Sequence, residues 1–169
     1  DFFEFFDVRD LQEGVWTDLS GLEVKPLLSP HPVETTTLTF RTLWGGRYYT
    51  YAHLTDIMSC ERLRARENGA KNLPKGFLQR IIDGYLTEVD LKKIDIGTDI
   101  VHGWATDFKD DKSDRIILAH TSVPLSDQQK EIGSSAPFGM IDVLIKNHTD
   151  PLLEKACLYL SDYLAGVEE

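Results

Sequence analysis

Two short segments of the chain place a histidine two residues before a hydroxyl side chain. His53 precedes Thr55, and His120 precedes Ser122. Each pair ends a run of β-branched, aromatic or apolar residues that is typical of a strand, and alternate residues of a strand project from the same face. If both pairs face one groove, one histidine can act as general base, the other as general acid, and the hydroxyls can hold phosphate oxygens.

This arrangement resembles the one in the two-histidine phosphoesterase superfamily. The separation of the two histidines, 120 minus 53 or 67 positions, is similar to that of the family. The resemblance implies a metal-independent phosphodiesterase that acts on cyclic nucleotides or RNA ends. It also implies that His53, Thr55, His120 and Ser122 are the catalytic residues. The alternative is that both histidines are ordinary strand residues, hydrogen-bonded to their neighbours.

The elements that would hold these pairs can be read from residue patterns. Strands are predicted at 35–44 and 47–54, joined by Gly45 and Gly46, because two glycines allow a tight hairpin turn. A second hairpin is predicted between 99–108 and 115–123, across the charged segment KDDKSD. One more strand is predicted at 138–147.

Helices are predicted after Asp56, from about Pro74 to Val89, and from Asp150 to Gly166, because apolar residues recur there at the helical period. The predicted fold class is therefore α+β. It is a largely antiparallel sheet built from two β-hairpins plus one further strand, with three helices packed mainly on one face.

The N-terminal part of the chain has a different composition. Residues 1–34 combine an aromatic-rich arm, DFFEFFDVRDLQEGVW, with a connector in which Pro26, Pro30 and Pro32 disfavour regular structure. We expect the arm to dock as a short helix or to bury itself in a partner. Residues 35–169 are predicted to form a single α+β domain.

Charge and cysteine content limit the functional classes. The net charge of -10 disfavours generic nucleic-acid binding and binding to anionic membranes. Cys60 and Cys157 lie in apolar helical patterns typical of buried free thiols, which favours a reducing, cytoplasmic compartment. The chain begins at Asp1 without Met, which is compatible with a processed or trimmed N-terminus.

The spacing of histidines and cysteines matches no common metal-site or cofactor motif. His31, His102 and His148 are scattered along the chain, and Cys-x-x-Cys and His-Glu-x-x-His patterns do not occur. No metal or cofactor is therefore predicted. The first prediction for function is a non-enzymatic binding or assembly domain that acts through a protein partner or as a homo-oligomer. The alternative is the metal-independent phosphodiesterase, with a small phosphodiester ligand.

Overall fold

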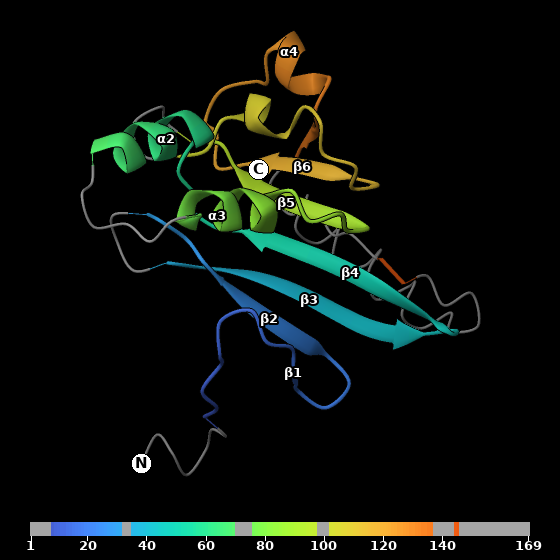
Figure 1. Cartoon of the computed structure of the whole chain (residues 1–169). Coiled ribbons are helices and arrows are strands. Elements are labelled where there is room, and N and C mark those ends of the chain that lie inside the picture. Colours follow the sequence, from blue (N-terminus) through green and yellow to red (C-terminus); the bar gives the residue numbers. More distant parts are fainter. Residues whose placement is uncertain (1–7, 32–34, 70–75, 98–101, 137–143, 146–169) are drawn as a thin grey trace, which may run out of the picture.

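The computed structural model of the chain describes residues 8–31, 35–69, 76–97, 102–136 and 144–145. In these ranges seven strands form a single sheet, in the order β1-β2-β3-β4-β5-β6-β7. The first four strands are antiparallel, whereas β4 to β7 pair in parallel (Figure 1). The sheet is therefore mixed, with β4 as the strand that belongs to both halves.

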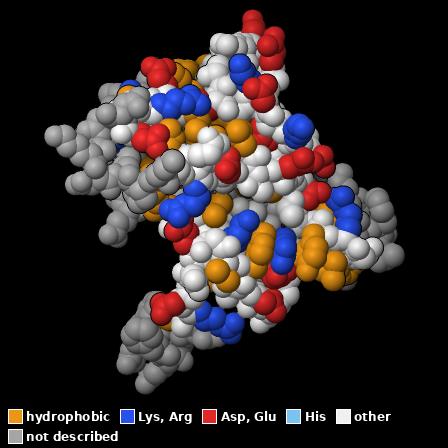
Figure 2. Space-filling view, viewed as in Figure 1, with side chains coloured by type: hydrophobic (Ala, Val, Ile, Leu, Met, Phe, Trp, Pro, Cys, Tyr) orange, Lys and Arg blue, Asp and Glu red, His pale blue; other side chains and the backbone are white. Residues whose placement is uncertain are grey.

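The antiparallel half comprises β1 (Thr17–Asp18), β2 (Glu23–Leu28), β3 (Thr36–Trp44) and β4 (Arg47–Leu54). Gly45 and Gly46 join β3 to β4 with φ angles of 57° and 83°, the left-handed conformation that a two-residue hairpin turn requires. On this half, basic and hydrophobic side chains alternate over the sheet surface (Figure 2). The Arg41 guanidinium lies 4.1 Å from the Trp16 ring centroid and 4.5 Å from that of Tyr48.

The predicted connector is in part a strand, since β2 contains Pro26 opposite Leu38. The carbonyl of Pro26 accepts a hydrogen bond from the amide of Gly14, 2.8 Å away, on the side away from β3. In an antiparallel strand the nitrogen and carbonyl of one residue point to the same side. Pro26 therefore costs no hydrogen bond in the ladder with β3, which is why the proline is tolerated here.

The parallel half corrects the predicted fold class. It adds β5 (Leu91–Asp95), β6 (Ile116–Ala119) and β7 (Ser134–Ser135). Strand β6 pairs in parallel with β5, so the predicted second hairpin between 99–108 and 115–123 is wrong, and so is a largely antiparallel sheet. The sequence LKKID of β5 contains two lysines and does not resemble that of a buried strand. Lys92 is nevertheless fully buried.

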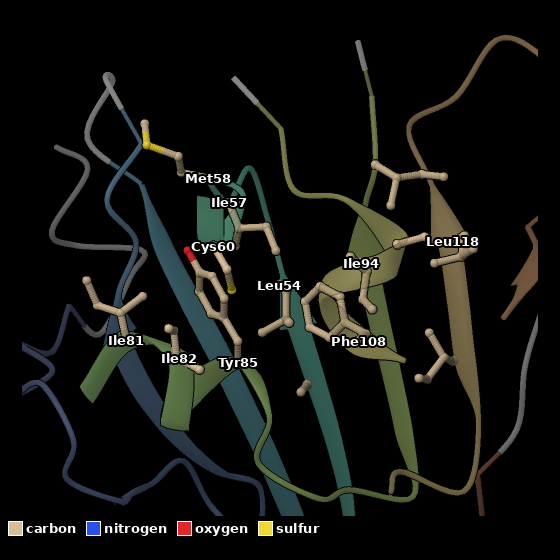
Figure 3. Packing of buried hydrophobic residues seen from close by; sticks show 14 of the residues in the cluster. Leu54, Ile57, Met58, Cys60, Ile81, Ile82, Tyr85, Ile94, Phe108 and Leu118 are labelled. Carbon is tan, nitrogen blue, oxygen red and sulfur yellow. The ribbon is translucent and has the colours of Figure 1, made fainter. Parts of the chain in front are cut away.

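The core lies between the sheet and the helices α2 (Cys60–Gly69) and α3 (Phe77–Tyr85), together with the short 3-10 helix η1 (Ala105–Phe108). Figure 3 shows Tyr85 and Phe108 close to Leu54 in this layer. Helix α3 buries the face made of Leu78, Ile81, Ile82 and Tyr85. These contacts fix α3 and η1 against β4 to β6.

Several predictions concern other parts of the chain. Residues 8–16 of the predicted arm are irregular and mostly exposed, so a docked helix is not formed there, and residues 1–7 of the arm lie outside the described residues. The predicted helix at 150–166 and Cys157 lie outside the described residues, as does all but 144–145 of the predicted strand at 138–147. Cys60 is a buried free thiol, and burial is the main reason that its pKa is raised, to about 11. Within the described ranges, the structure contains no helix long and apolar enough to cross a membrane.

Candidate metal centre

The carboxyl ends of three adjacent strands meet at one edge of the sheet. Strands β4, β5 and β6 are parallel and end at Leu54, Asp95 and Ala119. Asp56 lies two residues beyond β4, and His120 follows β6 directly. His102 lies in the crossover that leaves β5. Ligands of sheets with parallel strands commonly bind outside this edge, where the connections open.

These three side chains converge on one point. The Nδ1 atom of His102 lies 3.3 Å from Oδ1 of Asp56, and Nδ1 of His120 lies 3.4 Å from the same oxygen. The two imidazole rings are 4.6 Å apart at an interplanar angle of 72°. The cluster therefore brings ligand atoms of two imidazoles and one carboxylate within 4.8 Å of one another.

Two of the three spacings in the cluster fit a metal ion. Ligand atoms about 2.1 Å from a tetrahedral zinc ion are about 3.4 Å from each other. Both histidine-to-Asp56 distances, 3.3 and 3.4 Å, agree with that value. Imidazole and carboxylate are suitable donors for zinc and for other first-row divalent ions. His102 Nδ1 is buried, and no described residue forms a hydrogen bond with it, so this nitrogen keeps its capacity to ligate.

Backbone features hold two of these side chains in place. His120 has a φ of 60°, a left-handed conformation that is uncommon for a residue other than glycine and that clusters at functional sites. Gly97 packs on His102, since a Cβ atom at this position would lie 2.8 Å from Cδ2 of the ring. Any side chain at residue 97 would therefore displace the imidazole.

The backbone of Asp56 is held from the antiparallel half. The buried Ser29 hydroxyl donates a hydrogen bond to the backbone carbonyl of Asp56 at 2.7 Å. Two residues further on, the ring of His31 lies 6.3 Å from that of His102. The segment after β2 thus supports the cluster from the side, and this is one reason that the N-terminal strands matter for the site.

The cluster opens onto solvent. His102 and His120 line a groove of about 710 Å³. Asp56 is 37% exposed, whereas the His102 side chain is only 10% exposed. The remaining lining residues come from the loops after β5 and β6 and from the short helix α4 (Asp127–Lys130), and they are Ile96, Gly97, Thr121, Ser122, Val123 and Gln129. A molecule in this groove could reach the cluster directly.

The residues of the predicted phosphodiesterase site are only partly brought together. His120 and Ser122 line the groove, but His53 and Thr55 are not among its lining residues. His53 Nδ1 lies 2.9 Å from the Tyr51 hydroxyl, and the Thr55 hydroxyl donates to the Thr36 carbonyl at 3.2 Å. Burial, followed by the nearby Lys93 ammonium, lowers the pKa of His53. The assignment of these four residues as catalytic stays a prediction.

The sequence patterns gave no prominence to Asp56 and His102. In the sequence, Asp56 precedes a predicted helix, and His102 is one of three scattered histidines. Their 46-position separation, 102 minus 56, is bridged because β4 and β5 are neighbours with the same direction. The available signal was a polar residue just beyond each buried strand, and it becomes informative only when the strands are known to be parallel.

Comparisons with known proteins give little further guidance. No protein-family model matches the chain. No curated protein matches it either. Among solved structures, the chain is similar to one described as the metallo-beta-lactamase fold protein YhfI from Bacillus subtilis. The two are 13% identical with a TM-score of 0.48, over 74% of this chain and 50% of that protein. The chain thus spans half the length of that protein, and a similarity at this level identifies neither a family nor an activity.

Proposed function

We propose that the chain binds a divalent transition-metal ion through Asp56, His102 and His120, and that this centre serves a hydrolytic reaction. The observation that carries the proposal is the approach of two Nδ1 atoms to one carboxylate oxygen, at 3.3 and 3.4 Å. Without a cation, the two imidazoles approach one carboxylate oxygen, and Nδ1 of His102 has no hydrogen-bond partner among the described residues. With a cation, all three residues gain a common partner.

The number of protein ligands and the open groove favour a catalytic centre over a structural one. Structural zinc sites are usually closed by four protein ligands, whereas catalytic sites use three and leave a position for water or substrate. A divalent ion held here would acidify a bound water and polarise a substrate oxygen. Asp56 would supply the negative charge of the ligand set, and Gln129 and Ser122 line the groove beside it.

Metal binding can be tested directly by titrating the metal-free protein with Zn²⁺ and with Co²⁺. We expect one ion per chain, with the visible absorption bands of a tetrahedral or five-coordinate cobalt site. His102→Ala, His120→Ala and Asp56→Ala should each weaken binding at least about tenfold. His53→Ala is the matched control, because it removes a histidine outside the groove lining. Equal affinities for all four variants and the parent would reject the site.

The hydrolytic part needs a separate assay. A panel of phosphodiesters, phosphomonoesters and carboxylic esters would be incubated with the protein in Mn²⁺, in Zn²⁺ and in EDTA. Metal-dependent turnover that His102→Ala abolishes and His53→Ala preserves would support the proposal. Turnover in EDTA that depends on His53 and His120 would instead favour the metal-independent phosphodiesterase. Metal binding without turnover on any substrate would leave a binding centre and remove the hydrolytic claim.

A second candidate is the protein-binding or assembly function. The observation that favours it is a row of exposed apolar side chains in the N-terminal segment, namely Val8, Leu11, Val15, Leu19 and Leu22. Apolar side chains grouped in one exposed segment are typical of interaction sites. Sedimentation velocity of the parent and of the double variant Leu11→Ser, Val15→Ser tests the homo-oligomer form of this proposal. A parent that sediments as a monomer at all concentrations would contradict it.

A further inference from the structure

A second hollow, of about 570 Å³, lies beside the metal groove. Three residues, His120, Thr121 and Val123, line both. The loop after β6 therefore separates the groove from the second hollow, and the proposed metal ligand His120 lies at the start of this loop. The second hollow continues over the end of α4, β7 and the turn between them. These contribute Lys130, Ser134, Ser135 and Gly133.

The lining of this second hollow differs from the rest of the chain in charge. The chain has 28 acidic and 18 basic residues. None of the described residues that line the second hollow is acidic, and they include Lys130, Ser134 and Ser135. Lysine and serine side chains carry hydrogen-bond donors suited to an anion.

We propose that this hollow holds a phosphate group of the substrate, while the neighbouring part of the same substrate reaches the Asp56, His102 and His120 centre. The substrate class is then a phosphorylated small molecule, and this inference rests on the proposed function for the position of its reactive end. Donors that come from both α4 and β7 suit a tetrahedral anion better than a planar carboxylate, which presents two oxygens in one plane.

The walls of the hollow are held by local geometry. Ser134 and Ser135 pair in parallel with Ile117 and Leu118 of β6. This close approach depends on Gly133, because a Cβ atom there would lie 2.8 Å from the Ile116 carbonyl oxygen. The backbone of both serines is therefore held on the sheet, and a ligand would not have to order this segment.

The loop and the lysine complete the arrangement. The Thr121 hydroxyl donates to the Val123 carbonyl at 3.0 Å, which braces the loop between the two hollows. Lys130 forms an ion pair with Asp127 at 2.9 Å, but the side chains are 60% and 99% exposed. An ion pair this exposed contributes little stability, so Lys130 can turn to a ligand at low cost.

The test uses inorganic phosphate as the probe, followed by calorimetry or by ³¹P line broadening, in EDTA and again in Mn²⁺. Lys130→Gln and the double variant Ser134→Ala, Ser135→Ala are compared with the parent. Lys112→Gln is the matched control, because it removes one exposed lysine close to the start of β6, at the end opposite His120. We expect Lys130→Gln to weaken phosphate binding about tenfold and Lys112→Gln to leave it unchanged.

The outcomes separate this inference from the proposed function. If Lys130→Gln weakens phosphate binding in EDTA, the anion site is supported. If the parent protein then binds no metal, the proposed function alone fails. Phosphate binding that requires Mn²⁺ and ignores Lys130 overturns the inference, because the anion then sits on the ion, and it supports the metal centre. An absence of phosphate binding in both conditions, or equal binding by all variants, also overturns the inference. The Zn²⁺ titration described above then judges the metal centre by itself.

Discussion

The antiparallel and parallel halves of the sheet share β4 but differ in what their connections can do. In the antiparallel half, β3 and β4 are joined by two glycines, which leave no side chains to build a site. In the parallel half, each connection must carry the chain back along the whole strand. The crossovers after β4, β5 and β6 therefore begin at one edge, and Asp56, His102 and His120 lie there.

The halves also treat charge differently. In the antiparallel half Arg41 pairs with Glu23 at 2.8 Å, with side chains 27% and 23% exposed. In the parallel half Lys92 pairs with Asp111, and both side chains are fully buried. The Lys92 ammonium also donates to the Tyr85 carbonyl at 2.8 Å. Burial lowers the pKa of Lys92, with Asp111 opposing this effect. The stability of the parallel half therefore depends on both members of this buried ion pair, because either charge alone would be buried without a counter-ion.

The largest expected effect follows from that contrast. Lys92→Ala leaves the Asp111 carboxylate buried without its cation, and this should lower the free energy of unfolding by about 3–5 kcal/mol. The double variant Lys92→Met, Asp111→Leu should recover most of the loss, because it removes both charges. Urea denaturation at pH 7 measures both variants. Arg41→Ala is the control from the antiparallel half and should cost far less.

An intact stability for Lys92→Ala would contradict the contrast between the halves. A double variant as unstable as the single one would show that packing, rather than the unpaired charge, is the cause.

Two glycine substitutions sharpen the comparison at the level of the site. Gly97→Ala places a methyl group against the His102 ring and should weaken metal binding about 10- to 100-fold, the range found when the support of a ligand is disturbed. Gly46→Ala meets no neighbouring atom, but Gly46 has a φ of 83°. It should lower stability by about 1–2 kcal/mol without changing metal affinity. Zn²⁺ titration and denaturation of both variants check this, and the reverse pattern would refute it.

The smallest expected effect concerns the seam between the halves. Asp90 accepts hydrogen bonds from the Thr50 amide and hydroxyl, both at 2.7 Å, and from Arg47 at 2.6 Å. Burial raises the pKa of Asp90, but the Thr50 bonds and the Arg47 charge outweigh it, so the pKa is lowered. Stability from this group is thus complete above the ordinary pKa of about 3.9, and it is lost as the pH falls through the lowered value.

Asp90→Asn should therefore lower stability at pH 7 by about 1–2 kcal/mol. It should also make the loss of stability between pH 4 and pH 2 shallower than in the parent. Denaturation curves at pH 7, 4, 3 and 2 test both statements. A variant that is less stable at pH 7 but loses stability between pH 4 and pH 2 as steeply as the parent would contradict this. It would mean that the charge of Asp90 does not contribute to stability.

Elements whose sequence signal lies in adjacent residues were predicted well, whereas elements that depend on distant residues were not. The hairpin of β3 and β4 was predicted closely, because its signal lies in adjacent residues around Gly45 and Gly46. Helices α2 and α3 were also predicted near their observed positions. Strand β5 was missed because two of its five residues are lysines, and the burial of Lys92 depends on Asp111, 19 positions away. The error over β5 produced the wrong second hairpin.

The candidate site shows the same division. His120 and Ser122 were singled out by spacing, and both line the groove. The partner chosen for His120 was His53, because strand alternation and the same short motif are visible in sequence. The structure instead puts Asp56, three residues beyond His53, against His120. The spacing of residues along one strand does not show which side chain beyond its end will contact a residue that follows another strand.

The sequence by itself determined the acidic balance, the glycine turn of the hairpin, the amphipathic α3 and the polar residues that follow β4 and β6. These are properties of short segments, set by backbone conformation and by periodic burial. Only the tertiary structure decided that β4, β5 and β6 run in the same direction. Strand direction depends on long-range pairing, so the meeting of Asp56, His102 and His120 could not be seen in any one segment.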